Sequence, residues 1–370
     1  MIKIIDISFF THLNNDSIST LVNEHKAALG YIDHLKKRAD VQVIKHLVRE
    51  DVEIINGTCY SGFKGSKGFA NIPFKTLRFI KNQKPDVVIV QGLVFPVQVI
   101  LLRLILGKST KILVQHHGES PFKGIKKRLQ IMAGHFISGY LFTALENAEE
   151  WKRANIIKKK TKCFELPEAS THFKKQDKLQ SREINGLTGQ FNFLWVGRLN
   201  KGKDPLTVIH AFIKYAANNP EARLWMIYQA EELLPEIKIM IEQHADLRQR
   251  IVLLGKIGHE ELQSWFSAAD FYISGSHREG SGYALLEAMA CGCIPVVTAI
   301  ASFKKITQDG KYGLLYRAGN AGALFETLMQ LNKTDLGKMP EDIIEHFQQA
   351  LSFSSIAEDL YAICEKLTKK

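Results

Sequence analysis

Residues 270–299 read DFYISGSHREGSGYALLEAMACGCIPVVTA and contain the clearest structural signal of the chain. A short apolar run (270–274) precedes a turn of small residues (280–282), a helix-forming run (284–291) and a second apolar run (294–299). Two short buried strands joined by a helix are typical of a parallel sheet. This stretch therefore predicts an α/β domain built on parallel strands.

The alternation of strand and helix patterns continues along the rest of the chain. In the first half, strands are predicted over 2–7, 41–47, 86–92, 111–117, 141–145 and 162–167, and helical stretches over 19–38, 73–83 and 123–137. In the second half, the other strands are predicted over 191–197, 223–228 and 251–255, and the other helices over 203–218, 231–245 and 259–268. This repeated alternation predicts two tandem doubly wound α/β domains.

The polar segment 168–190 has no apolar period and is the predicted linker between the domains. We expect an N-terminal domain over 1–185, a C-terminal domain over 186–345, and a C-terminal helix in 346–370 that packs back toward the N-terminal domain. Residues 56–71 contain four glycines, and we predict a mobile loop there. Their spacing does not match a phosphate-binding P-loop.

The net charge of +11 is concentrated in the first half of the chain. Residues 1–180 contain 29 Lys and Arg against 16 Asp and Glu, whereas residues 181–370 contain 20 against 22. The asymmetry indicates that the first half faces an anionic partner. The run KGIKKRLQIMAGHF (123–136) places basic residues beside apolar ones at helical spacing, which favours contact with anionic lipid headgroups. A solvated face whose apolar side chains pack inward is the alternative.

The composition excludes several classes of protein. Hydrophobic residues make up 45% and charged residues 24%, which is not the balance of a disordered or fibrous chain. Five scattered cysteines favour a reducing compartment, and no His/Cys cluster at zinc spacing accompanies Cys291 and Cys293. The N-terminal run is interpreted as a strand rather than a signal peptide, and no transmembrane helix is predicted. We therefore expect a cytoplasmic protein.

Two glutamates flank the turn of small residues. Glu279 lies in the loop and Glu287 in the following helix, with Gly280, Ser281 and Gly282 between the loop and the helix. Backbone N–H groups at a helix N-terminus without bulky side chains suit a phosphate or diphosphate. Carboxylates accept hydrogen bonds from sugar hydroxyls. The residue types therefore point to a ligand that combines a diphosphate with a sugar.

The motif EGSGYALLE, an E-x7-E pattern followed by AMACGCIPVV, resembles the signature of retaining glycosyltransferase family 4. The segments VGRLNKGKDPLTVIHAF (196–212) and DGKYGLLY (309–316) are similar to other segments of that family. The resemblance is strong over 191–330. It implies two Rossmann-like domains facing a central cleft, the fold called GT-B, with the active site between them.

The resemblance implies a role for each matching residue. Glu279 would bind hydroxyls of the transferred sugar, and Glu287 the ribose of the nucleotide. Arg198 and one lysine, Lys203 or Lys201, would bind the leaving diphosphate, where negative charge accumulates; Lys203 is the first choice and Lys201 stays open. Further donor contacts are implied at Gly197, Gly280, Ser281, Gly282 and Ile257, the last with Lys256 beside the nucleobase.

The N-terminal domain would bind the acceptor. The segment QHHGESPFKG (115–124) follows a predicted strand, and the family often has a histidine at that strand end. His117 is the first choice for a catalytic role and His116 the alternative. Tyr228 departs from the family pattern, because a glycine-rich turn is usual there.

The function implied is that of a retaining hexosyltransferase that moves a sugar from a nucleoside-diphosphate donor to a hydroxyl of a glycan or lipid-linked acceptor, in cell-envelope polysaccharide synthesis. A UDP-sugar is expected in preference to a GDP-sugar. No cofactor, metal or nucleic acid is implied, and an anionic membrane surface is a candidate partner, on the inner face of the membrane. The alternatives are a nucleotide-sugar epimerase or hydrolase on the same scaffold, or a non-catalytic protein that binds polyanions or membranes.

Overall fold

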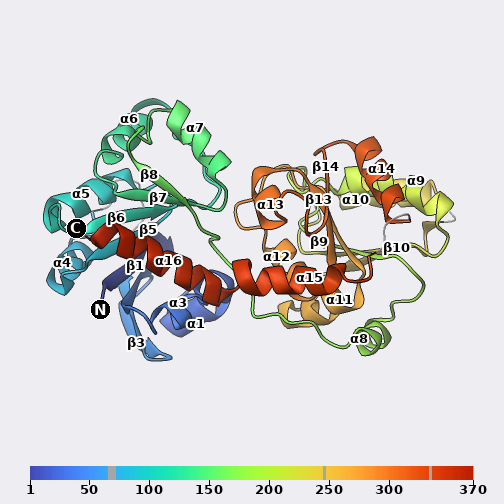
Figure 1. Ribbon diagram of the computed structural model, residues 1–370, viewed down its shortest axis with the longest axis horizontal. Coiled ribbons are helices and arrows are strands. Elements are labelled where there is room, and N and C mark those ends of the chain that lie inside the picture. The colour runs from blue at the N-terminus through green and yellow to red at the C-terminus, as the bar shows by residue number, and fades with distance from the viewer. Residues whose placement is uncertain (66–71, 245–246, 333–335, 370) are drawn as a thin grey trace. The chain divides into compact units, whose positions relative to one another are not determined.

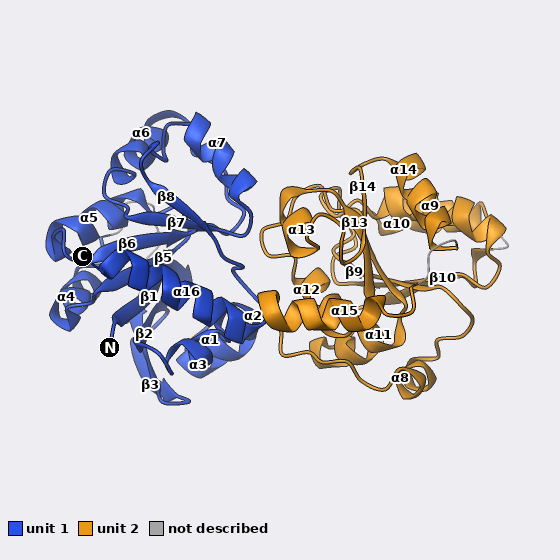
Figure 2. Cartoon of the chain, viewed as in Figure 1, with its two compact units in different colours: residues 1–170, 352–370 blue, residues 171–351 orange. Residues whose placement is uncertain are grey.

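The computed structural model describes residues 1–65, 72–244, 247–332 and 336–369. The chain folds into two compact units (Figure 2). Unit 1 contains residues 1–170 and 352–370, and unit 2 contains residues 171–351. Residues 171–185 thus lie in unit 2, although they fall within the expected N-terminal domain 1–185.

The described residues of unit 1 form an eight-stranded sheet in the order β3-β4-β2-β1-β5-β6-β7-β8. All neighbours run parallel except β3 and β4, which are antiparallel. The strands are β1 (Lys3–His12), β2 (Asp40–Leu47), β3 (Asp51–Ile55), β4 (Thr58–Lys64), β5 (Val87–Gln91), β6 (Lys111–Gln115), β7 (Gly139–Phe142) and β8 (Lys162–Glu165).

Alternate residues of these strands enter two separate cores. In β5, Val87 and Ile89 belong to one core, and Val88 and Val90 to the other. This period of two places apolar side chains on both faces, which is how a parallel strand covered by helices on both sides is built. The helices are α1 (Ile18–Glu24), α2 (Lys26–Leu29), α3 (Ile32–Leu35), α4 (Phe74–Gln83), α5 (Pro96–Leu106), α6 (Gly124–Ala133) and α7 (Ala148–Arg153), with a 3₁₀ turn η1 (Leu145–Asn147).

Helix α16 (Phe353–Thr368) follows unit 2 in sequence but belongs to unit 1. In Figure 1 it is drawn in red among the blue elements of unit 1. Ser352 caps its N-terminus by accepting a hydrogen bond from the backbone N–H of Ser355 at 3.2 Å. Phe353, Ile356 and Leu360 are buried in the same core as β1 and β2. Helix α16 therefore completes one face of the unit 1 sheet.

Two predicted ranges of unit 1 have a different structure. The predicted loop 56–71 contains strand β4, because Asn56 and Gly57, with φ of 50° and 80°, form a tight turn between β3 and β4. Residues 66–71 of that loop lie outside the described residues. The helical stretch 19–38 is three short helices, interrupted at His25 and Gly30.

The described residues of unit 2 form a six-stranded sheet, all parallel, in the order β11-β10-β9-β12-β13-β14. Counted within the unit, this is the 3-2-1-4-5-6 order of a dinucleotide-binding domain. The strands are β9 (Asn192–Gly197), β10 (Arg223–Tyr228), β11 (Ile251–Gly255), β12 (Phe271–Ser274), β13 (Ile294–Thr298) and β14 (Leu314–Tyr316).

Helices connect the strands of unit 2. They are α8 (Lys178–Asn185), α9 (Pro205–Asn218), α10 (Leu234–Glu242), α11 (Leu262–Ala268), α12 (Tyr283–Ala290), α13 (Ala301–Ile306), α14 (Ala321–Leu331) and α15 (Met339–His346), with the 3₁₀ turn η3 (His259–Glu261) and the π-helical turn η4 (Phe347–Leu351). Helix α8 lies within 168–190, so this predicted linker is partly helical. Asp177 caps α8 by accepting a hydrogen bond from the N–H of Gln180 at 2.8 Å.

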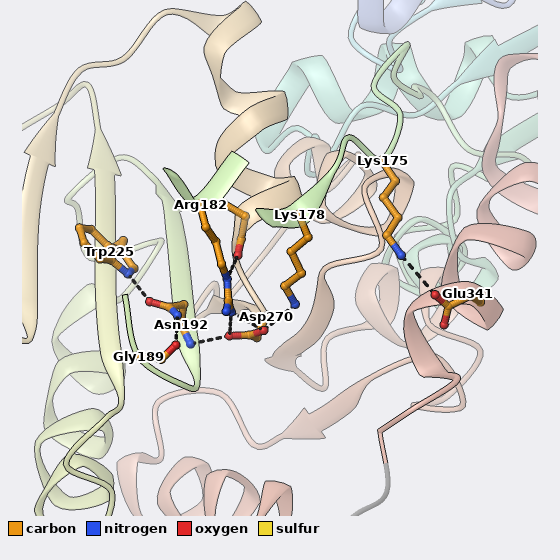
Figure 3. Close-up of polar contacts among 9 residues, drawn as sticks. Lys175, Lys178, Arg182, Gly189, Asn192, Trp225, Asp270 and Glu341 are labelled. Atoms are coloured by element: carbon orange, nitrogen blue, oxygen red, sulfur yellow. Dashed lines mark hydrogen bonds and ion pairs between the residues drawn. The ribbon is translucent and has the colours of Figure 1, made fainter. Parts of the chain in front are cut away.

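The carboxylate of Asp270 joins α8 to the sheet of unit 2 (Figure 3). It accepts hydrogen bonds from Arg182 Nη2 at 2.7 and 2.9 Å and from Lys178 Nζ at 2.6 Å. It also accepts the backbone N–H of Asn192, the first residue of β9, at 2.8 Å. Its side chain is 20% exposed and that of Arg182 is 24% exposed. The cluster therefore fixes a helix and two strand starts in a partly desolvated site.

We predict that Asp270→Ala lowers the free energy of unfolding by about 2–4 kcal/mol, because it leaves Arg182 and the N–H of Asn192 without their acceptor. Chemical denaturation followed by circular dichroism measures the loss. Lys175→Ala is the matched control, since it removes an exposed ion pair with Glu341 and should cost less than about 0.5 kcal/mol. Equal midpoints for the two variants would contradict the role of Asp270.

Candidate functional site

The strand order of unit 2 reverses between β9 and β12, and ligands of open α/β sheets bind at the carboxyl ends of the strands at such a point. These two strands pair only through Phe271 with Phe193 and Tyr272 with Leu194. Past Tyr272 the pairing stops, and a loop follows each of the two strands at its carboxyl end. The candidate site is built from these loops.

The loop after β9 places Lys203 just before α9. The side chain of Asn200 accepts a hydrogen bond from the backbone N–H of Lys203 at 3.0 Å. The next residue, Asp204, has φ of 43° and caps α9 by accepting from the N–H of Thr207 at 3.2 Å. Asp204 also lies 3.0 Å from His277 Nε2 in the loop after β12. The two loops are thus bonded to each other.

Lys203 forms an ion pair with Glu279. The same oxygen, Oε1 of Glu279, accepts a hydrogen bond from Ser276 Oγ at 2.6 Å. The carbonyl of Ser276 in turn accepts from Thr298 Oγ1 at 2.6 Å, at the end of β13. Glu279 is 14% exposed in its side chain and Lys203 33%. The structure therefore places a half-buried carboxylate and an ammonium group together at the reversal point of the sheet.

Two glycines make this arrangement sterically allowed. A Cβ on Gly275 would lie 2.5 Å from the carbonyl oxygen of Asp204, so only glycine lets the two loops approach. Gly282 has φ of +65° and precedes α12. Because a glycine occupies this N-cap position, no N-cap side chain competes for the first N–H groups of α12. They are the donors that a helix N-terminus presents to an anion.

Glu287 lies on α12, where its carboxylate is 8% exposed. His259 of η3 reaches it, with Nε2 at 2.6 Å from Oε1. Burial, and next the negative charge of Glu279, raises the pKa of Tyr272, to which the charge of Glu287 also contributes. Both carboxylates therefore act on the same buried phenol of β12. The two glutamates of the E-x7-E pattern lie in one region of unit 2.

The other residues named from the sequence lie around this region. Arg198 directly follows β9 and is exposed, and no hydrogen bond or ion pair of its guanidinium is seen within the described residues. Lys201 is also exposed, and the structure brings Lys203 rather than Lys201 to Glu279. The remaining ones are Gly197 at the end of β9, the half-buried Gly280 and Ser281, and the half-buried Ile257 after β11, beside the exposed Lys256.

Tyr228, which departs from the family pattern, is the last residue of β10 and is 6% exposed. Burial, and then the charge of Glu231, raises the pKa of its phenol. The segment after it stays close to the site, because Ala230 accepts a hydrogen bond from the N–H of Leu199 at 2.9 Å. The bulky side chain therefore packs into unit 2 at this strand end.

The two histidines of unit 1 lie in different environments. His116 is 3% exposed and packs against Phe142 and Trp151, and burial lowers its pKa. His117 reaches Glu168 with Nδ1 and Gln91 with Nε2. Burial alone would lower the pKa of His117, but the hydrogen bond and charge of Glu168 raise it above its ordinary value. His116 is thus a core residue, and His117 belongs to a charged cluster.

Sequence reasoning missed several of these partners. His259 and Ser276 contact the two glutamates of unit 2, and Gln91 and Glu168 contact His117. Glu168 lies in the segment that the polar pattern assigns to a linker, and His259 is 28 residues from Glu287. No local motif marks any of them. Among the described residues, no group of three or more His, Cys, Asp or Glu side chains is arranged to hold a metal ion.

Residues 177–350, just under half of the chain, match the family model described as glycosyl transferases group 1. The matched residues lie within unit 2. The matched range holds the ion pair of Lys203 with Glu279 and the pair of His259 with Glu287. The resemblance drawn from the sequence is therefore confirmed at the level of the family.

Among curated proteins, the chain is similar to D-inositol 3-phosphate glycosyltransferase from Pseudarthrobacter chlorophenolicus, with 27% identity over 168 residues. The alignment covers 43% of this chain and 40% of that protein. N-acetyl-alpha-D-glucosaminyl L-malate synthase from Bacillus anthracis is 25% identical over 162 residues, which cover 44% and 41% of the two chains. The chain thus spans about two fifths of the length of the curated relatives it matches.

Solved structures match along nearly the whole chain. Anabaena Alr3699/HepE in complex with UDP has a TM-score of 0.72 and 15% identity, and the match covers 99% of this chain and 100% of the other. Sucrose-phosphate synthase from Thermosynechococcus elongatus has a TM-score of 0.69 and 17% identity, with 99% of both chains covered. At this identity the likeness shows the fold alone. The predicted fold class, two tandem Rossmann-like α/β domains of the GT-B type, is confirmed.

Proposed function

We propose that the chain is a retaining glycosyltransferase that moves a sugar from a nucleoside-diphosphate donor to a hydroxyl group of an acceptor. The observation that carries the proposal is the ion pair of Lys203 with Glu279 beside the N-terminus of α12, in a group 1 domain. A cation, a carboxylate and the backbone N–H groups of a helix N-terminus are what a sugar diphosphate needs. Supporting it, the curated relatives are named as glycosyltransferases and related synthases.

The donor would bind unit 2, with each group matched to one part of the molecule. Arg198 and Lys203 would neutralise the diphosphate, whose negative charge increases as the bond to the sugar breaks. Glu279 would accept hydrogen bonds from the hydroxyls of the transferred sugar, and Glu287 from the ribose hydroxyls. Lys203 is favoured over Lys201 because its ammonium group is already at Glu279. Gly197, Gly280, Ser281, Gly282 and Ile257 would line the donor.

The reaction would retain the configuration at the sugar carbon. The bond from that carbon to the diphosphate oxygen breaks, and the acceptor oxygen forms the new bond on the same face. The departing phosphate oxygen takes the proton of the acceptor hydroxyl, so no protein base is required. The role of the enzyme is then to hold both substrates and to stabilise the charge of the leaving group.

A UDP-sugar is the proposed donor, in line with the UDP named for the matched Anabaena structure. The acceptor would bind unit 1, where His117 lies at the carboxyl end of β6. We propose a glycan or lipid-linked acceptor of cell-envelope polysaccharide synthesis.

A screen of UDP-, GDP- and ADP-sugars for released nucleoside diphosphate tests the proposal: release that depends on an added hydroxyl acceptor supports transfer. Release without acceptor would favour a hydrolase, and no release with any donor would contradict the proposal.

A cytoplasmic protein that docks on the inner face of a membrane is proposed for the location. Within the described ranges, no helix is both long and apolar enough to cross a bilayer. On α6, Ile125 is 76% exposed and Met132 45% exposed. They are seven residues apart and so share one helix face. Lys126 and Arg128 on the same helix are exposed too, which gives a basic surface with an apolar stripe.

We predict that Arg198→Ala lowers the transfer rate about 10²–10³-fold, because one preorganised donor to the leaving group is lost. Glu287→Ala is expected to remove most activity through loss of nucleotide binding. Released nucleoside diphosphate is the measured quantity, and circular dichroism checks the fold. Arg248→Ala, an exposed arginine of unit 2, is the control and should transfer normally. Full activity in a folded Arg198→Ala variant would remove the diphosphate assignment.

Transfer is predicted to survive excess EDTA. Arg198 and Lys203 supply the positive charge that Mg²⁺ or Mn²⁺ supplies in metal-dependent enzymes. The initial rate with and without chelator is the measurement. A rate that falls to background with EDTA and returns with Mn²⁺ or Mg²⁺ would show that these side chains are not sufficient.

Sedimentation with vesicles is predicted to increase with the content of anionic lipid and to decrease at high salt. Each basic residue near such a surface contributes about 1 kcal/mol. Charge reversal at Lys126, Lys127 and Arg128 should weaken sedimentation and leave nucleotide binding unchanged. Wild-type protein that stays in the supernatant with anionic vesicles at low salt would exclude the membrane surface and favour a soluble acceptor.

A further inference from the structure

A continuous chain of polar contacts crosses the unit 1 sheet at the carboxyl ends of its strands. Gln91 is the last residue of β5, His117 follows β6, and Glu168 follows β8. His117 Nδ1 is paired with Glu168, and Nε2 lies 2.7 Å from Gln91 Oε1. Gln91 Nε2 donates a hydrogen bond to Asp6 of β1. The imidazole thus has a hydrogen-bonding neighbour at both ring nitrogens.

The direction of each hydrogen bond follows from Asp6. Its carboxylate is 1% exposed, accepts from the hydroxyl of Tyr31 at 2.7 Å and lies 3.4 Å from Lys45 Nζ. Paired with a cation, it is an acceptor only. Gln91 must therefore turn its NH₂ group to Asp6 and its carbonyl oxygen to His117. That carbonyl can only accept, so Nε2 of His117 carries a proton.

The other ring nitrogen faces a carboxylate. The side chain of Glu168 is 2% exposed, and a charge so deeply buried is stable only with a charged partner. Nδ1 lies in ion-pair contact with Glu168, and a carboxylate at this position favours the protonated form of the nitrogen. With Nε2 donating to Gln91, both nitrogens are then protonated and His117 is an imidazolium. Glu119 holds the backbone of the same residue by accepting its N–H at 2.7 Å. The ring is thus fixed in place and in protonation state.

We propose that Glu168 is a positioning residue of the acceptor region: it keeps His117 as an imidazolium whose Nε2–H is presented to an oxygen acceptor, at the position that Gln91 Oε1 occupies. The inference rests on the proposed function in one respect, that the substrate oxygen which replaces Gln91 belongs to a sugar or its acceptor. The hydroxyl and phosphate oxygens of such molecules can accept this hydrogen bond as the amide oxygen does.

The groups around the ring determine its pH dependence. Burial lowers the pKa of His117, whereas Glu168, Glu119 and Asp6 raise it, with a net increase above the ordinary value of 6.5. His116 is the neighbouring histidine, and burial lowers its pKa, so it does not carry a competing charge at neutral pH. Lys45 is paired with Asp6, which it reaches at 3.4 Å. A raised pKa means that the protonated form is still the major one at pH 6.5 and is lost as pH rises through the folded-state pKa.

The direct test is an NMR titration of the histidine ring nitrogens in the full chain, with His117 assigned by comparison with His117→Gln. In the wild type, His117 should titrate above 6.5. In Glu168→Gln its pKa should fall by at least about one unit, because the charge that offsets burial is gone. Glu165→Gln, three residues earlier, is the matched control and should leave the titration unchanged. A wild-type pKa below 6.5, or an unchanged pKa in a folded Glu168→Gln variant, would overturn the proposal.

The pH profile of transfer provides a second readout that a purely structural role would not move. At a pH above the pKa of His117 in both proteins, each unit by which the variant lowers this pKa reduces the imidazolium fraction about tenfold. Glu168→Gln should therefore lose about tenfold in kcat/KM at alkaline pH and regain most of it on acidification. Loss at every pH to the same extent would overturn the positioning role. If the wild type transfers no sugar, the proposed function fails, and the NMR titration still decides the state of His117.

Discussion

The carboxylate of Asp270 is the interaction on which the order of unit 2 depends. It stands at the start of β12 and binds a helix, α8, and the first N–H of β9. The two residue pairs that β9 and β12 share, Phe271 with Phe193 and Tyr272 with Leu194, directly follow this contact, so Asp270 stands at the end where the two strands are aligned. Strand β12 is also paired with β13 along its four residues, and Thr298 of β13 donates a hydrogen bond to the carbonyl of Ser276 after β12. The carboxylate at the amino edge of the sheet and the pairing with β13 thus together place the loop that carries Glu279.

The two units place different polar networks at equivalent points of their sheets. In unit 2, the loops after β9 and β12 are joined through Lys203 and Glu279, and both side chains remain partly exposed. In unit 1, Asp6 and Glu168 are almost fully buried, with their charges offset by Lys45 and His117. The side chains of His117 and Lys203 are about equally exposed, at 32% and 33%, but the carboxylates of unit 1 are more deeply buried than Glu279. A deeply buried carboxylate is destabilised more strongly if its cationic partner leaves. The unit 1 network is therefore suited to hold a group still, and the unit 2 network to rearrange.

Most of the strands could be predicted from the sequence, because a parallel strand covered on both faces is a short uninterrupted apolar run. The E-x7-E motif could also be recognised, since its spacing is local. The hairpin of β3 and β4 was missed because its glycines suggested a loop, although Asn56–Gly57 is itself a hairpin signal. Contacts such as Glu168 with His117 join distant segments and depend on strand order. No pattern along the chain contains that information.

The discontinuity of unit 1 has a consequence for how the chain is made. Helix α16 supplies Phe353, Ile356 and Leu360 to a core whose strands are all encoded before residue 170. During synthesis, unit 2 leaves the ribosome before this helix does. The apolar side chains on one face of the unit 1 sheet therefore stay uncovered until α16 has been synthesised. Unit 1 is thus begun first and completed last. Until α16 is made, a chaperone that recognises exposed apolar surface can bind the uncovered face of its sheet.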